Sequence, residues 1–213
     1  RGYLPYANLN GIFSCIHYFY YPYDKLFMDM ILDKKNLIVL IKRLSNFNLA
    51  AAEQLLRRGV EMITTCDDLG DGQNLLFSPA LYNELFKSYH KELADLCHSY
   101  GAILHLHSHG NITKILPDLV EVGIDMINPF DPTEVGVLAD IKEAFGKKIT
   151  IVGGMSKFFF ELNCNEMREY LKHTISTGRK GGGFVLMDSG GIPDNVTVEK
   201  YNFYREISRE LRW

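Results

Sequence analysis

One local pattern recurs along the chain: an amphipathic helical stretch, then a glycine, then a short apolar run. The glycine and its apolar run occur at Gly59-Val-Glu-Met-Ile, Gly101-Ala-Ile-Leu, Gly123-Ile-Asp-Met-Ile, Gly146-Lys-Lys-Ile-Thr-Ile and Gly182-Gly-Phe-Val-Leu-Met. Glycine commonly ends a helix in the left-handed conformation, after which the chain can enter a strand. The intervals between the glycines are too irregular for a solenoid repeat, and they are typical of βα units joined by loops of different lengths.

Helix signals lie between these runs. Ser78-Pro79 is an N-cap with a first-turn proline, and it opens a predicted helix with Leu81, Leu85, Tyr89, Leu93 and Leu96 on one face. Further helices are predicted after Thr133, after Asn165, from Lys34 to Arg58, and from Thr197 to Leu211 with Val198, Tyr201 and Ile207 facing inward. The segment from Gly11 to Tyr18 is rich in β-branched and aromatic residues, which predicts one more strand.

Six strands, each followed by a helix, predict an all-parallel sheet of the α/β class. We expect a (β/α)8 TIM-barrel-like fold that lacks the first one or two βα units and is open beside the strand at 11–18. An open doubly wound sheet would place its ligand at similar strand ends, so this pattern alone leaves both architectures open. With 46% hydrophobic residues, the chain can bury one core, and residues 1–213 are expected to form a single, N-terminally incomplete domain.

Polar residues follow the predicted strands, at Asp67-Asp68, His107-Ser-His109, Asn128-Pro129, Gly153-Gly154 and Asp188-Ser189. In a (β/α) barrel these carboxyl ends of the strands carry the catalytic groups. Strand alternation places Asp67 and Asp68 on opposite faces, so one of the two is expected to be catalytic and the other to cap the following loop.

Three histidines stand at alternate positions in the stretch Gly101–Asn111. If this stretch is a strand, His105, His107 and His109 share one face. A pair of adjacent imidazoles could then chelate one metal ion or hold an anionic substrate. The alternative is that some of these histidines are merely hydrogen-bonded in a polar barrel interior.

The charge distribution argues against two classes of partner. The net charge is −3 and charged residues are interspersed, so neither nucleic acid nor a membrane surface is an expected partner. There is no signal-peptide pattern and no apolar run as long as a membrane span. The four cysteines are widely spaced without a CxxC pair, which favours a reduced, cytoplasmic protein.

The order of several motifs resembles the uroporphyrinogen decarboxylase superfamily, which also contains cobalamin-dependent methyltransferases. The motifs are Asp67-Asp68-Leu69-Gly70, Ser78-Pro79, His107-Ser-His-Gly-Asn111, Leu116-Pro117-Asp118-Leu119, Gly123-Ile-Asp125, Asn128-Pro129, Gly153-Gly154 and Gly182-Gly183. The resemblance runs from about Gly11 to the C-terminus. It implies a (β/α)8 barrel of which this chain corresponds to the C-terminal two-thirds.

The methyltransferase branch is similar at the histidine strand, where its members bind zinc through a His-x-Cys-Gly pattern. His107 matches the first ligand and His109 stands at the cysteine position, where imidazole is a competent ligand. Gly190 stands where a last cysteine ligand would be, so the third ligand would come from a carboxylate such as Asp188 or Asp68.

The resemblance therefore implies a methyltransferase that uses zinc and a corrinoid carried by a partner protein. Asp67, Asp68 and His107 would be catalytic, His107 and His109 would bind the metal, and Asn111 and Asp188 would contact the cofactor. The substrate would be a small molecule. The aromatic run from Tyr18 to Tyr23 would line a cavity for a flat ligand or form a homodimer surface.

Three alternatives remain open from the sequence. A uroporphyrinogen decarboxylase, a lyase of porphyrin biosynthesis, would use Asp67 or Asp68 as an acid and no cofactor. It also needs a cationic wall for carboxylates, and only Lys157 follows a strand end. The protein could instead be a non-catalytic remnant that binds a ligand or partner, because Gly190 cannot ligate a metal. The last alternative is an unrelated metal-dependent hydrolase that uses the same histidine pair.

Overall fold

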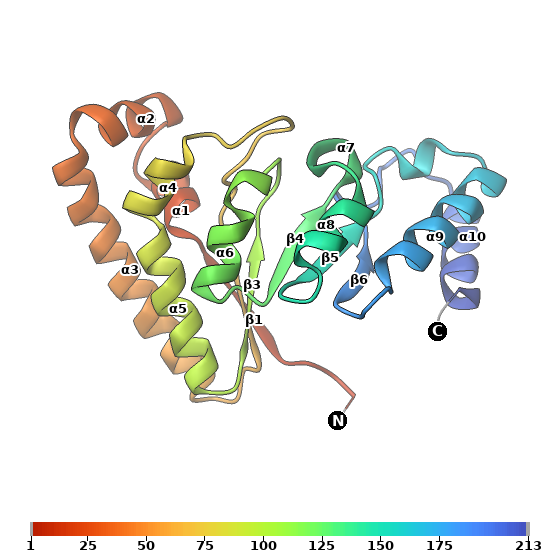
Figure 1. The fold of residues 1–213 in the computed structure, drawn as a ribbon, viewed down its shortest axis with the longest axis horizontal. Helices are drawn as coiled ribbons and strands as arrows, with labels where there is room; N and C mark the ends of the chain where they lie inside the picture. Colours follow the sequence, from red (N-terminus) through yellow and green to blue (C-terminus); the bar gives the residue numbers. More distant parts are fainter. Residues whose placement is uncertain (1, 212–213) are drawn as a thin grey trace. The chain divides into compact units, whose positions relative to one another are not determined.

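The computed structural model describes residues 2–211, which divide between Ile127 and Asn128 into two compact units (Figure 1). Along the chain six strands alternate with helices, as the glycine pattern predicted. The expectation of a single domain stays a prediction. None of the helices within residues 2–211 is both long and apolar enough to cross a membrane.

The first unit holds three parallel strands, β1 (Tyr6–Asn10), β2 (Met62–Cys66) and β3 (Ile103–His107). Its helices are α1 (Ile12–Phe19), α2 (Tyr23–Leu32), α3 (Lys34–Leu56), α4 (Pro79–Leu85), α5 (Lys87–Ser99) and α6 (Leu116–Val122), the last preceded by the short 3-10 helix η1 (Thr113–Ile115). The long helices α3 and α5 lie side by side, and α5 also packs on β3 (Figure 1). Strand β4 (Met126–Phe130) crosses the division between the units.

The second unit holds the parallel pair β5 (Thr150–Gly154) and β6 (Phe184–Met187). Its helices are α7 (Pro132–Val135), α8 (Leu138–Phe145), the short 3-10 helix η2 (Phe159–Glu161), α9 (Cys164–Gly178) and α10 (Val198–Glu210). Its core contains Met155, Phe159, Phe160, Met167, Leu171, Ile175 and Ile207.

Strands that follow one another in the chain are neighbours and parallel in each unit, β1 to β2 to β3 and β5 to β6. A doubly wound sheet would instead reverse its strand order at a switch point. The predicted α/β, TIM-barrel-like class is therefore confirmed.

The prediction of a strand at 11–18 is wrong, because this segment forms α1 and the strand lies before it at β1. Ile12, Phe13 and Ile16 are fully buried at helical spacing, and the rings of Phe13 and Phe77 lie 5.1 Å apart. The β-branched and aromatic composition thus fills the packing between α1 and the neighbouring helices. By contrast, β1 is mostly exposed. Its sequence hardly alternates between apolar and polar residues, so the sequence pattern did not predict this strand.

Two helix predictions also need correction. The helix after Ser78 begins as predicted, since the Ser78 side chain accepts a hydrogen bond from the Leu81 amide, but it breaks at Phe86 into α4 and α5. In α10, Ile207 is buried as predicted, whereas Val198 is 69% exposed. Val198 is the first residue after the N-cap Thr197, where the helix has not yet reached the core.

Replacing Gly11 should test how tightly α1 closes on the end of β2. A Cβ at Gly11 would lie 2.2 Å from the Cγ of Asp67, whereas one at Gly72 meets nothing within 4 Å. We expect Gly11→Ala to lower the free energy of unfolding by about 1–3 kcal/mol through overpacking. Gly72→Ala is the matched control and should leave it unchanged. Urea unfolding measures both, and an unchanged midpoint for Gly11→Ala would contradict this packing.

Asp131 gives the second unit a predicted pH dependence. Burial raises the pKa of this carboxyl, but hydrogen bonds from Thr133, Ser189 and the Lys157 amide outweigh it, so the pKa lies below the ordinary 3.8. Because the folded-state pKa is lowered, the stabilisation is present above about pH 3.8 and is lost as the pH falls through the lowered pKa.

We expect Asp131→Asn to destabilise the protein by about 1–3 kcal/mol at pH 7, since the amide cannot accept all these bonds. Urea unfolding should show this difference shrinking below about pH 3.8. Asp140→Asn, at an exposed position in the first turn of α8, is the control. A difference that stays constant down to pH 2.5 would refute the charge-based explanation.

Candidate functional site

The carboxyl ends of β1, β2 and β3 are aligned. Register places Asn10 beside Cys66 and Cys66 beside His107. The hydrogen bonds continue past the strands, from the Gly11 amide to the Cys66 carbonyl and from the Asp67 amide to the His107 carbonyl. The residues that follow β2 and β3 are therefore held side by side.

Asp67 is fully buried. One of its carboxylate oxygens accepts a hydrogen bond of 2.8 Å from the Ser14 amide in the first turn of α1. The other lies 3.6 Å from Nε2 of His90, which is also fully buried. The ring of His90 is held from its far side by the Tyr82 hydroxyl, 3.0 Å from Nδ1. This environment makes Asp67 the residue that fixes α1 onto β2.

Asp68 points to the other side, as strand alternation predicted for one member of the pair. Its side chain is 30% exposed, and its Oδ1 lies 4.0 Å from Nε2 of His107, which is 28% exposed. The same oxygen accepts a hydrogen bond of 2.9 Å from the His109 amide. Its own amide donates to the Ser14 hydroxyl. Asp68 is thus a positioned carboxylate that solvent and substrate can reach.

The three histidines of the β3 segment differ in how deeply they are buried. The rings of His107 and His109 are 4.8 Å apart and nearly perpendicular, and Asp68 lies beside the His107 ring and the His109 amide. His105 is 9% exposed and pairs with the Thr64 hydroxyl, with 3.2 Å between Oγ1 and Nδ1. Only the last two histidines therefore belong to the accessible group, which we call the Asp68–His107–His109 site.

The two other predicted site residues are engaged locally. The side-chain oxygen of Asn111 accepts hydrogen bonds from the amide and hydroxyl of Thr113, at the start of the short 3-10 helix. Asp188 lies in the second unit, where its carboxylate accepts a hydrogen bond from the Gly191 amide. Their roles as cofactor contacts stay predictions. A Cβ at Gly190 would meet open space, so a cysteine could be accommodated there.

Three residues that sequence reasoning did not single out organise the site. Ser14 links both aspartates, and Ser108 accepts a hydrogen bond from the Leu69 amide. His90 is buried against Asp67. The sequence contains no signal for Ser14 because its segment reads as a strand, nor for His90, which stands alone in a helix.

Aromatic residues lie near the accessible carboxylate. Burial raises the pKa of the Tyr23 phenol, and repulsion from an ionised Tyr18 and from the Asp68 carboxylate raises it further. The ring of His17 stacks on that of Tyr23. Tyr18 and its neighbours Phe19 and Tyr20 are more than half exposed, so this run presents an open aromatic face.

The donor set for a zinc ion is incomplete among the described residues. Within residues 2–211, no three side chains of His, Cys, Asp or Glu lie close enough together to hold one metal ion. A catalytic zinc usually has three protein ligands, and the paired imidazoles provide two. The described residues alone therefore do not fit a complete zinc centre, and zinc binding stays a prediction.

The fold and the site define an α/β, barrel-like protein with an acid–histidine cluster at the carboxyl ends of its strands. The sequence model of the family described as uroporphyrinogen decarboxylase (URO-D) matches residues 7–211. The chain belongs to this family. No curated protein sequence matches it.

Two solved structures are similar in fold. A methyltransferase from Methanosarcina mazei has a TM-score of 0.76 at 19% identity, over 97% of this chain and 58% of that one. A dihydropteroate synthase from Anaplasma phagocytophilum, with bound 6-hydroxymethylpterin-monophosphate, has a TM-score of 0.52 at 17% identity, over 96% of this chain and 74% of that one. This chain therefore spans 58% of the methyltransferase's length, and at these identities the likeness shows the fold.

The different environments of the two aspartates lead to a stability prediction. Asp67→Ala removes a buried acceptor from the Ser14 amide and leaves His90 facing an empty space, so we expect a loss of about 2–3 kcal/mol. Asp68→Ala, at a partly exposed position, should cost less than about 1 kcal/mol. Thermal and urea unfolding of both variants decide this, and equal losses would refute the assignment of Asp67 as structural.

Proposed function

We propose that this chain is part of a methyltransferase of the URO-D family, and that the Asp68–His107–His109 site activates the methyl acceptor. The observation that carries the proposal is the accessible carboxylate at the carboxyl ends of β2 and β3, which lies 4.0 Å from the His107 imidazole and accepts a hydrogen bond from the His109 amide. Family membership and the fold shared with a methyltransferase support it. The methyl donor is a corrinoid on a partner protein, and the acceptor is a small thiol.

Each residue of the site has a separate role in activating the acceptor. His107 takes the proton from the acceptor thiol, since an imidazole has a pKa suited to a general base near neutral pH. Asp68 lies 4.0 Å from Nε2 of His107 and stabilises the imidazolium that forms. His109 donates a hydrogen bond to the resulting thiolate. Asp68 is held by its bond to the His109 amide, so it needs no rearrangement during the reaction.

The corrinoid, when bound, supplies the reactive methyl group, and the protein orients it toward the acceptor. The exposed aromatic face beside Tyr23 is the surface of this chain best suited to a flat macrocycle.

Decarboxylation of a porphyrinogen is the second candidate, because Asp68 is a reachable acid and the family takes its name from that reaction. This reaction also requires cations to hold several carboxylates. Lys157, the cation that sequence analysis singled out, is paired with Glu134 at 3.0 Å. The methyltransferase is therefore the better-supported proposal.

An assay of methyl transfer from methylcobalamin to a small thiol tests the proposal with the full-length protein. The change in corrinoid absorbance measures the rate. We expect His107→Gln to lower the rate by about 100-fold, within the usual range for a lost general base, and Asp68→Asn to lower it because the imidazolium loses its countercharge. His173→Gln, at an exposed position in α9, is the control and should retain the full rate.

The same preparation is incubated with uroporphyrinogen, and the products are separated by the number of carboxylates. Loss of carboxylates without any methyl transfer would overturn the methyltransferase in favour of the decarboxylase.

Metal analysis addresses the zinc prediction separately. If His107 and His109 bind zinc, His107→Ala should reduce the zinc content of the purified protein to background. The family resemblance puts a cysteine ligand at position 190, which has room for a Cβ, so Gly190→Cys is expected to raise the zinc content. Zinc retained at full occupancy in His107→Ala would place the metal elsewhere.

A further inference from the structure

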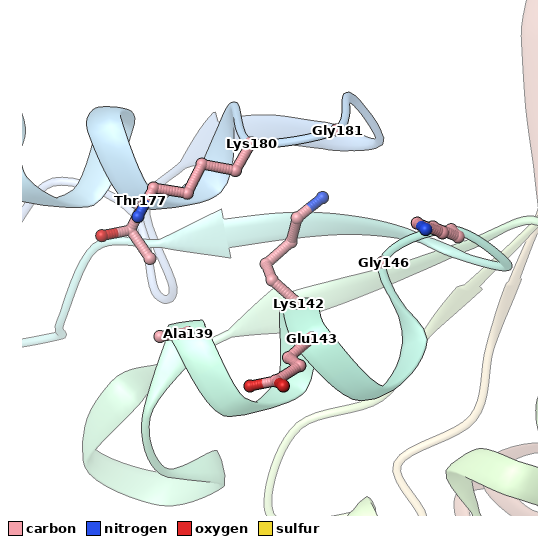
Figure 2. A pocket seen from close by; sticks show the side chains of 8 residues that line it. Ala139, Lys142, Glu143, Gly146, Thr177, Lys180 and Gly181 are labelled. Carbon is pink, nitrogen blue, oxygen red and sulfur yellow. The ribbon is translucent and has the colours of Figure 1, made fainter.

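The second unit contains a cavity of about 470 Å³ between α8, α9 and the glycine loop that enters β6 (Figure 2). Its charged lining residues are Lys142, Lys147, Lys180 and Glu143, accompanied by Thr177 and Gly181. These residues lie in the segments that precede β5 and β6, and none of them belongs to the Asp68–His107–His109 site. A cavity of this size accommodates a small organic molecule.

The lining carries uncompensated positive charge. The ion pairs of the second unit join other residues, so within the described chain neither Glu143 nor any of the three lysines that line the cavity is in an ion pair. The carbonyl ends of α8 and α9 offset part of this charge. Three ammonium groups against one carboxylate still leave an excess of positive charge, and a recessed excess of this kind attracts anions.

Lys142 is a positioned cation rather than a solvated one. Only 8% of the residue is exposed, and its ammonium donates to the carbonyls of Gly182 and Gly183. An ammonium has three donors, so one remains after these two bonds. Figure 2 shows the side chain rising from α8 toward the loop at Gly181. Burial lowers the pKa of this lysine, and a bound anion would favour its charged form.

The opposite wall offers a hydroxyl and an open backbone. Lys180 and Thr177 both line the cavity, and in Figure 2 the side chain of Lys180 extends in the direction of Thr177. Gly181 and Gly182 both have a φ of +75°, and a Cβ at either would meet nothing within 4 Å. Glycine there keeps the loop turned while leaving its outer side clear of side chains.

We infer that this cavity binds a phosphorylated small molecule. Lysines bind phosphate as point charges, and the excess of three ammonium groups over one carboxylate suits a ligand with more than one negative charge. The phosphate lies between Lys142, Lys147 and Lys180, and the Thr177 hydroxyl donates to it. The site does not depend on the proposed methyltransferase function.

Calorimetric titration of the full-length protein with pyrophosphate at low salt tests the inference. We expect a dissociation constant below about 1 mM that weakens as salt rises. Lys147→Gln and Lys180→Gln should each weaken binding by about fivefold, the effect of one ammonium near a phosphate in a solvated site. Glu143→Gln should strengthen it. Lys142→Met should abolish it, but this buried position can also affect folding, so the two exposed lysines carry the test.

Lys172→Gln is the matched control, because Lys172 lies on α9 outside the cavity and this substitution removes the same charge. It should change the affinity by less than about twofold. An equal loss in this variant would mean that pyrophosphate responds only to net charge, and the site would be refuted. Absence of binding heat up to 10 mM pyrophosphate, or tighter binding of citrate than of pyrophosphate, would also overturn the phosphate site.

Discussion

The buried carboxylate of Asp67 is the constraint on which the first unit depends. It accepts a hydrogen bond from the amide of Ser14 in the first turn of α1, and it faces the buried imidazole of His90 in α5. It therefore joins both helices to the end of β2. A buried carboxylate without such partners would cost several kcal/mol, so the surrounding residues must leave room for these contacts. Gly11 is one such restriction, because any side chain there would collide with Asp67.

The same contact organises the accessible face of the site. The Ser14 hydroxyl accepts a hydrogen bond from the Asp68 amide, and the Ser14 amide donates one to the Asp67 carboxylate. Helix α1 therefore holds both aspartates. Asp68 is then fixed against the histidine strand by the amide of His109. The chemistry proposed for His107 therefore rests on a carboxylate whose position is set before any substrate arrives, and such preorganisation is where enzymes gain most of their electrostatic stabilisation.

The second unit uses buried polar groups in a different way. Asp131 collects hydrogen bonds from Thr133, Ser189 and the Lys157 amide, and these bonds fix the loops that follow β4, β5 and β6. At the segments that enter β5 and β6, Lys142 reaches two glycine carbonyls and leaves a cationic cavity beside them. The Asp131 carboxylate is occupied by hydrogen bonds within the protein, whereas the Lys142 ammonium keeps one donor for a ligand.

Local sequence determined the alternation of strands and helices, because glycine stops and the Ser78 cap act over a few residues. Alternation also placed Asp67 and Asp68 on opposite faces and brought His107 and His109 together. Only the tertiary structure decided which aspartate is accessible, that residues 11–18 form a helix, and that Ser14 and His90 belong to the site. These outcomes depend on contacts between residues more than twenty positions apart, where burial outweighs local propensity.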